Sequence, residues 1–254
     1  MKINQNQLNS AILLVALVVV LNLLHGNNAF SMDMIVTKLY MLPGIIIGLT
    51  LHEFSHAMVS YKLGDPTPKE QGRITVNPLK HIDPIGFVAL IMAGFGWGVP
   101  VQINPNYYKK RRLGEALVAV AGVTMNLIIA FVFALILKLM YSSGIAVSTN
   151  EPLHVIAMIL QYGILVNIIL MIFNLLPIPP LDGFNLVTQI FRLDKYSWWY
   201  QFYRLGTFIL LGLILLNVLD IVINPLIYGH SVNRQRPIIS KLNIKRKKNI
   251  STHR

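Results

Sequence analysis

Long apolar segments alternate with short polar segments along most of the sequence. A helix needs about 20 apolar residues to cross the hydrocarbon core of a bilayer, and several segments reach or approach that length. These segments cover residues 8–24, 36–63, 113–140, 153–176 and 203–226. The pattern predicts an all-α polytopic membrane protein with about five to six transmembrane helices.

Two stretches between the second and third long segments break this pattern. Residues 73–77 alternate weakly between polar and apolar side chains, as a short β-strand does. Residues 85–99 are apolar but short and rich in glycine, which favours a re-entrant or interfacial hairpin over a helix. We therefore expect a small β-strand or re-entrant loop element after the second long segment.

The composition and charge agree with a membrane protein. Hydrophobic residues make up 54% of the 254 residues and charged residues only 13%. The formal charge of +12 comes from basic residues that gather between the apolar segments and near the C-terminal end. Because cytoplasmic loops of membrane proteins are rich in Lys and Arg, we interpret this charge as facing anionic lipid of the bilayer, and we expect no nucleic-acid partner. The basic cluster at residues 109–112 then marks the cytoplasmic side.

The segments group into one transmembrane domain and a tail. We expect the domain to cover residues 1–229, with its core at residues 36–192, and a basic tail to cover residues 230–254. Five crossings from a cytoplasmic N-terminus would place this tail on the outer side, against the same charge rule. Either residues 85–99 cross the bilayer fully, which would put the basic cluster at 109–112 on the wrong side, or the chain turns back near Asp220 and Pro225, and we favour the turn.

The second long segment carries the strongest candidate for chemistry, the run His52-Glu53-Phe54-Ser55-His56. Two histidines four residues apart project from one face of a helix, so both imidazoles can bind one metal ion. Glu53 can reach a water molecule on that ion. The sequence has no cysteine, and zinc accepts His nitrogen and carboxylate oxygen ligands. Ionisable side chains are costly within a span, which favours a functional metal site over a polar packing face.

A catalytic zinc site needs a third protein ligand, and the chain has few carboxylates to supply one. Asp182 is the best candidate, because it follows a helix end broken by prolines at 177–180, and Gly183 allows the backbone to pass close to an ion. Glu115 and Asp220 also lie within or beside predicted spans. His81 and Asp83 form a competing polar pair, which we interpret as hydrogen-bonding groups that order their loop.

Further motifs follow the histidine pair in a fixed order. They are Gly-Arg-Ile-Thr-Val-Asn-Pro-Leu-Lys-His-Ile-Asp-Pro at residues 72–84, Phe-Gly-Trp-Gly-Val-Pro-Val-Gln-Ile-Asn-Pro at 95–105, and Asn-Leu-Leu-Pro-Ile-Pro-Pro-Leu-Asp-Gly at 174–183. Together with the His-Glu-x-x-His run they resemble the site-2 protease family of intramembrane zinc metalloproteases, in its compact bacterial and archaeal branch. The family usually has proline where this sequence has Val123, which bears on the local shape of that helix.

The resemblance implies a metalloendopeptidase in which His52, His56 and Asp182 bind Zn²⁺, Glu53 acts as the catalytic base, and Asn174 lies beside the bound substrate. It also implies a multi-pass protein of the bacterial plasma membrane with its active site toward the cytoplasmic side. The expected substrates are membrane-anchored proteins that are cut within their transmembrane segments, in regulated intramembrane proteolysis. A regulatory membrane protein is a further expected partner.

Other functions fit part of the pattern. A zinc-binding membrane carrier or a catalytically silent scaffold would keep the same metal ligands, and the substitution Glu53→Gln separates these functions from a protease. A heme or quinone protein that uses His25 or His154 needs histidines opposed across helices, and the spacing of these two residues does not support it.

Overall fold

The structure is a computed structural model, and it describes residues 32–93, 96, 98–143 and 151–216. The predicted first span at residues 8–24 and the predicted tail at residues 230–254 lie outside the described residues. The chain divides into two compact units with the boundary after Leu210. The site described below lies wholly within the first unit.

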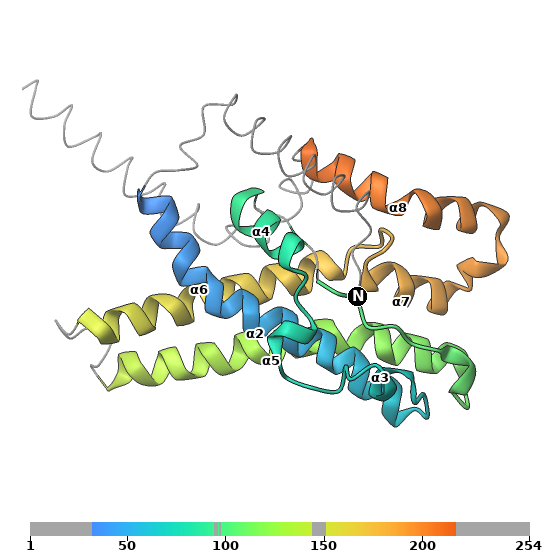
Figure 1. Cartoon of the computed structure of the whole chain (residues 1–254), viewed down its shortest axis with the longest axis horizontal. Coiled ribbons are helices and arrows are strands. Elements are labelled where there is room, and N and C mark those ends of the chain that lie inside the picture. Colours follow the sequence, from blue (N-terminus) through green and yellow to red (C-terminus); the bar gives the residue numbers. More distant parts are fainter. Residues whose placement is uncertain (1–31, 94–95, 97, 144–150, 217–254) are drawn as a thin grey trace, which may run out of the picture. The chain divides into compact units, whose positions relative to one another are not determined.

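Three long helices pack against one another in the first unit (Figure 1). They are α2 (Met32–Lys62), α5 (Arg111–Ser142) and α6 (Glu151–Asn174). Each contains a stretch that is long and apolar enough to cross a membrane, which confirms the predicted segments at residues 36–63, 113–140 and 153–176. The total number of spans stays a prediction, because residues 8–24 and residues 217–226 of the last predicted segment lie outside the described residues.

Glycines let α2 and α6 approach closely. A Cβ atom on Gly44 of α2 would lie 2.6 Å from the Cα atom of Gly163 on α6, so the two backbones are almost in contact there. Small residues at such crossings are typical of helices packed in membranes. Two asparagines, Asn126 of α5 and Asn167 of α6, are fully buried beside this crossing.

The described residues also form four shorter α-helices: α3 (Thr67–Glu70), α4 (Pro84–Ala93), α7 (Asp182–Phe191) and α8 (Ser197–Leu215). The helix α4 corrects the expectation of a hairpin for the first part of residues 85–99, whereas residues 94, 95 and 97 lie outside the described residues. Asp83 explains why a helix begins here, because its Oδ1 atom accepts hydrogen bonds from the backbone N–H groups of Ile85 and Gly86. With ten residues, α4 is about 15 Å long, which is too short to cross a bilayer.

The predicted strand at residues 73–77 is wrong. This segment is a loop, and the described residues contain a single isolated antiparallel bridge, between Ile82 and Gly98. Polar groups of this loop that could pair with a neighbouring strand form local hydrogen bonds instead. The Thr75 carbonyl oxygen lies 2.7 Å from His81 Nε2, and Asn77 caps a short 3₁₀ helix with its side chain.

The prolines at residues 177–180 end α6 at Asn174, as the sequence predicts. The sequence analysis did not predict that a new helix, α7, begins directly at Asp182. Gly183 makes this possible, since a Cβ atom there would lie 2.7 Å from the carbonyl oxygen of Leu176 and would collide with that of Leu175. The start of α7 is thereby held against the end of α6.

Candidate metal centre

His52 and His56 lie one helical turn apart on α2 and face α5 and α7. Both residues are buried, with exposed fractions of 5% and 7%. Their rings meet edge to face, and the two Nε2 atoms lie 3.0 Å apart. The spacing of the motif therefore places both imidazoles on one face of the helix, as expected.

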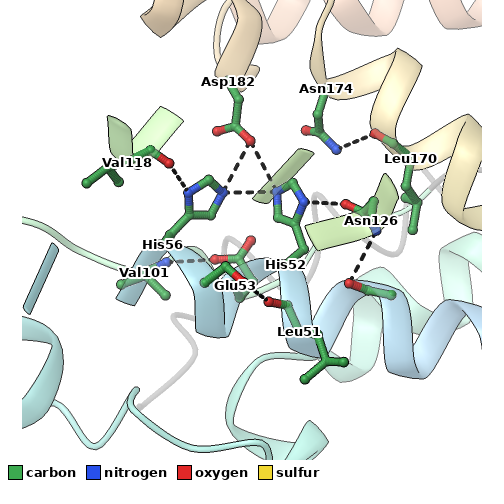
Figure 2. A network of polar contacts seen from close by, with 12 residues as sticks. Leu51, His52, Glu53, His56, Val101, Val118, Asn126, Leu170, Asn174 and Asp182 are labelled. Carbon is green, nitrogen blue, oxygen red and sulfur yellow. Dashed lines mark hydrogen bonds and ion pairs between the residues drawn. The ribbon is translucent and has the colours of Figure 1, made fainter. Parts of the chain in front are cut away.

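Asp182, the first residue of α7, completes this group. Its Oδ2 atom lies 3.2 Å from Nε2 of His52 and 3.2 Å from Nε2 of His56 (Figure 2). These are the three residues for which the sequence predicts a common site, although Asp182 stands 126 positions after His56 in the chain. Among the described residues, this is the one group of three His, Asp or Glu side chains whose ligand atoms converge on a point.

The hydrogen bonds of the two rings determine where their lone pairs point. His56 Nδ1 lies 2.7 Å from the backbone carbonyl oxygen of Val118, and His52 Nδ1 lies 2.6 Å from Oδ1 of Asn126. Both partners are acceptors, so each Nδ1 carries the proton and each Nε2 of a neutral ring presents its lone pair. Two nitrogen lone pairs and a carboxylate oxygen thus face one another inside the protein.

This arrangement fits a divalent cation. The Oδ2 atom of Asp182 is buried and accepts no hydrogen bond. One proton can lie on only one of the three facing atoms, whereas one cation contacts all of them. A tetrahedral zinc ion with bonds of about 2.0–2.1 Å holds its ligand atoms about 3.3 Å apart, close to the separations of 3.0 and 3.2 Å found here.

Gly122 on α5 leaves the space that an ion at this point needs. A Cβ atom on this residue would lie 2.5 Å from His56 Nε2 and 2.6 Å from His52 Nε2. A methyl group would therefore occupy the space beside both nitrogen atoms. Nitrogen and carboxylate ligands without cysteine suit zinc, so the donor set and the available space agree.

Glu53 lies next to the histidine pair but is not part of the converging group. Its carboxylate is half-buried, and Oε2 accepts a hydrogen bond of 3.1 Å from the backbone N–H of Val101 (Figure 2). Val101 belongs to an extended segment, residues 99–104, in which Pro100 and Gln102 are exposed. Glu53 thus lies between the buried histidines and a segment that reaches solvent.

The model of peptidase family M50 matches residues 9–215, which is most of the chain. The chain belongs to peptidase family M50, the site-2 protease family. It is therefore a zinc metalloprotease, and the three long apolar helices among its described residues support a membrane protein.

Named relatives agree with this membership in M50. YwhC of Bacillus subtilis, provisionally named a zinc metalloprotease, is 42% identical over 155 residues, which are 59% of this chain and 68% of YwhC. The Rip2 proteins of two mycobacteria are likewise provisionally named zinc metalloproteases. Rip2 of Mycolicibacterium smegmatis is 31% identical over 152 residues, and Rip2 of Mycobacterium tuberculosis is 28% identical over 150 residues. Those matches cover 57% and 56% of this chain, and 54% of each Rip2 protein, so the chain spans about half of their length. No solved structure matches the chain.

The remaining predicted residue, Asn174, ends α6 on the same side of the histidine pair as Asp182 (Figure 2). Its Nδ2 atom donates a hydrogen bond of 2.9 Å to the carbonyl oxygen of Leu170. This bond uses one of the two amide protons, and the side chain is half-buried. Its expected role beside the substrate stays a prediction.

The sequence analysis missed Gly122 and Asn126 as residues of the site. Their spacing of four residues, within an apolar helix, was the available signal, because it places a small residue and a polar residue on one face. The loop residues His81 and Asp83 do not join the metal centre. The hydrogen bonds of His81 to Thr75 and of Asp83 to the start of α4 confirm that they order their loop.

A buried carboxylate, Asp65, ties the extended segment next to Glu53 to the end of α2. Asp65 is fully buried and accepts hydrogen bonds from the hydroxyl of Ser60 and from the backbone N–H groups of Thr67 and Asn104. Burial alone would raise the pKa of this carboxyl, but the hydrogen bonds from Thr67, Asn104 and Ser60 lower it on balance. The ionised Asp65 therefore fixes the segment that donates to Glu53.

Proposed function

We propose that this M50 protein is an intramembrane endopeptidase that cuts the transmembrane segments of membrane-anchored proteins. In this proposal, His52, His56 and Asp182 hold the zinc ion and Glu53 is the catalytic base. The observation that carries it is the convergence of two lone pairs and one carboxylate oxygen at separations of 3.0 to 3.2 Å, on helices that include a candidate membrane span.

Each residue has a distinct role. A zinc ion held by His52, His56 and Asp182 would supply Lewis-acid chemistry, which would make water more acidic and polarise the scissile carbonyl. Glu53 takes the proton of the attacking water on its carboxylate and passes it to the leaving amine. The N–H of Val101 holds one carboxylate oxygen of Glu53, which orients the other for this transfer.

Water has to reach a site that lies below the lipid surface. His56 precedes Lys62, the last residue of α2, by six residues, so it lies about 9 Å from that helix end. Lys62 and the basic residues that precede α5 mark this end as cytoplasmic by the charge rule. The half-buried Glu53 and the exposed Gln102 support entry of water from that side, along the segment 99–104.

The substrate has to unwind near this site. A helical substrate uses its backbone groups in its own hydrogen bonds, so its peptide bond becomes accessible only in an extended segment. The half-buried Asn174 stands beside the metal centre, and its second amide proton supports a contact with the substrate backbone. We include in the proposal a location in the bacterial plasma membrane and a role in regulated intramembrane proteolysis, in which a membrane protein controls access.

The test compares wild type with Glu53→Gln. Both proteins are purified in detergent, their zinc content is measured, and they are incubated with a panel of single-span membrane proteins. The variant should keep its zinc, because Glu53 is not among the ligands, and should lose cleavage by at least about 100-fold, the usual contribution of a catalytic base. Glu70→Gln, the same change at an exposed residue of α3, is the matched control.

Two outcomes would contradict the proposal. Unchanged cleavage by Glu53→Gln would exclude Glu53 as the base. The second outcome is a zinc-loaded wild type that cuts no member of the panel, together with a Glu53→Gln variant that still supports the cellular role of the protein. That combination would favour a zinc carrier or a silent scaffold.

A further inference from the structure

We propose that Asn167 of α6 is a positioning residue for the metal centre, which acts through the side-chain amide of Asn126 to keep Nε2 of His52 free for the metal. Nothing in the motifs singles out Asn167, and it touches none of the three residues that converge on the site. The inference rests on the proposed function, because it concerns the zinc site assigned there.

The chain of contacts begins at two backbone carbonyl groups. Asn167 Nδ2 donates to the carbonyl oxygen of Gly163 at 2.9 Å and to that of Gly44 on α2 at 3.3 Å. Carbonyl oxygens only accept, so they hold the nitrogen of this amide in place. Asn167 is completely buried, so its amide is shielded from bulk solvent. Its oxygen, Oδ1, is therefore directed away from these carbonyl groups.

The next contact transfers this orientation to α5. Asn126 Nδ2 donates to Oδ1 of Asn167 at 3.0 Å, and it lies 3.5 Å from the carbonyl oxygen of Gly48. With its nitrogen engaged there, Asn126 presents Oδ1 to Nδ1 of His52 at 2.6 Å, the contact drawn in Figure 2. Three helices thus contribute to one directed series of hydrogen bonds that ends on the histidine ring.

The direction of this series decides whether His52 can bind a metal. If the Asn126 amide rotated by half a turn, its NH₂ group would face Nδ1 of His52, and Nδ1 would have to accept. The proton of the neutral ring would then lie on Nε2, which could no longer offer a lone pair. Asn167 prevents this rotation, because a rotated Asn126 would place its own oxygen against Oδ1 of Asn167.

Glycines on α2 make the series possible. A Cβ atom on Gly48 would lie 2.7 Å from Oδ1 of Asn167, and one on Gly44 would lie 2.6 Å from Gly163 Cα. The close approach brings the Gly44 carbonyl within reach of the Asn167 amide. A buried asparagine in a membrane bundle commonly only joins helices, so the test has to separate that role from orientation of the Asn126 amide.

The test measures zinc affinity of the purified full-length chain by competition with a chelator. Asn167→Leu should weaken zinc binding by about 10- to 100-fold, the usual effect of a residue that orients a metal ligand. Asn126→Asp is the reference variant, because its carboxylate can only accept from Nδ1 of His52, while its second oxygen faces Oδ1 of Asn167 in place of the donor that wild type has there. Gln161→Leu, the same loss of an amide at an exposed position of α6, should leave the affinity unchanged.

The double variant Asn126→Asp, Asn167→Leu is decisive. An aspartate cannot present a donor to His52, so the orienting role of Asn167 is no longer needed. Zinc affinity of the double variant should be at least that of Asn126→Asp and higher than that of Asn167→Leu. A double variant as weak as Asn167→Leu would show that Asn167 acts by packing, and would overturn the inference. Unchanged affinity in Asn167→Leu alone would overturn it too.

Further measurements keep the two proposals distinguishable. Thermal unfolding of the metal-free proteins reports helix packing. The unfolding midpoint should fall by about the same amount in Asn167→Leu and in the double variant. Asn167→Ser, a small polar residue that membrane helix interfaces accept, repeats the comparison if the leucine variant does not fold. A wild type without zinc would contradict the proposed function itself. If the wild type holds zinc but the double variant binds it as weakly as Asn167→Leu does, only the role of Asn167 is contradicted.

Discussion

Replacement of Gly122 by alanine should disable the metal centre without unfolding the protein. The new Cβ atom would lie 2.5 Å from His52 Cε1 and 2.5 Å from His56 Nε2, whereas such atoms normally approach to about 3.5 Å. The rings would have to retreat by about 1 Å. The Nδ1 atoms of His52 and His56 are hydrogen-bonded to Asn126 and Val118, respectively, and both partners lie on the same helix as Gly122. Movement of the rings away from Gly122 would therefore break both hydrogen bonds.

The expected loss follows from this displacement. A misplacement of about 1 Å costs about 100-fold in a catalytic site, or about 2.7 kcal/mol at 1.36 kcal/mol for each tenfold change. We expect zinc affinity and cleavage to fall at least that far, since the methyl group also occupies space beside the nitrogen atoms. Zinc content and substrate cleavage are measured together, with circular dichroism as a check on helix content.

Gly212→Ala is the matched control for this variant. A Cβ atom at Gly212 meets nothing within 4 Å, and the residue lies in helix α8. Alanine there should leave zinc binding unchanged and should stabilise the helix by about 0.5–1 kcal/mol. Zinc affinity and cleavage close to wild type in Gly122→Ala would refute the placement of the ion between the two rings and α5.

Two other substitutions test how the site is held in place. Gly183→Ala should lower zinc affinity, because the methyl group would collide with the carbonyl groups of Leu175 and Leu176 and push Asp182 away from the histidines; equal zinc content in the variant and wild type would contradict this. Asp65→Asn should lower the free energy of unfolding by about 1–3 kcal/mol at neutral pH, since an amide cannot accept all the bonds that the carboxylate accepts. Because folding lowers the pKa of Asp65 from 3.8, its contribution is complete above that pH and is lost as the pH falls below it, so denaturation curves of wild type and variant should converge in acid.

The sequence was sufficient for the long helices and for the three side chains that converge on the candidate metal centre. The apolar runs predict α2, α5 and α6 closely, because a bilayer demands about 20 apolar residues whatever the neighbours are. His52 and His56 share a face through local helix geometry alone. Asp182 was recognisable because it follows prolines that must end a helix, and because few carboxylates were available.

Other features depend on tertiary contacts that a pattern does not contain. Alternation over residues 73–77 resembles a strand, but strands need a partner, and this loop uses its polar groups locally. The run that begins with Asp182 and Gly183 resembles a turn, yet it starts α7 because Gly183 fits against the end of α6. The roles of Gly122 and Asn167 depend on which faces of three helices meet, and that rotation is set only when the helices pack.

The central claim is tested most directly by the zinc content of the purified wild type beside that of Asp182→Ala, with X-ray absorption at the zinc edge of the wild type. The account predicts one zinc per wild-type chain, coordinated by two imidazole nitrogen atoms and oxygen, and loss of that zinc in Asp182→Ala. A wild type free of metal, or a variant that keeps the same zinc with the same coordination, would contradict it.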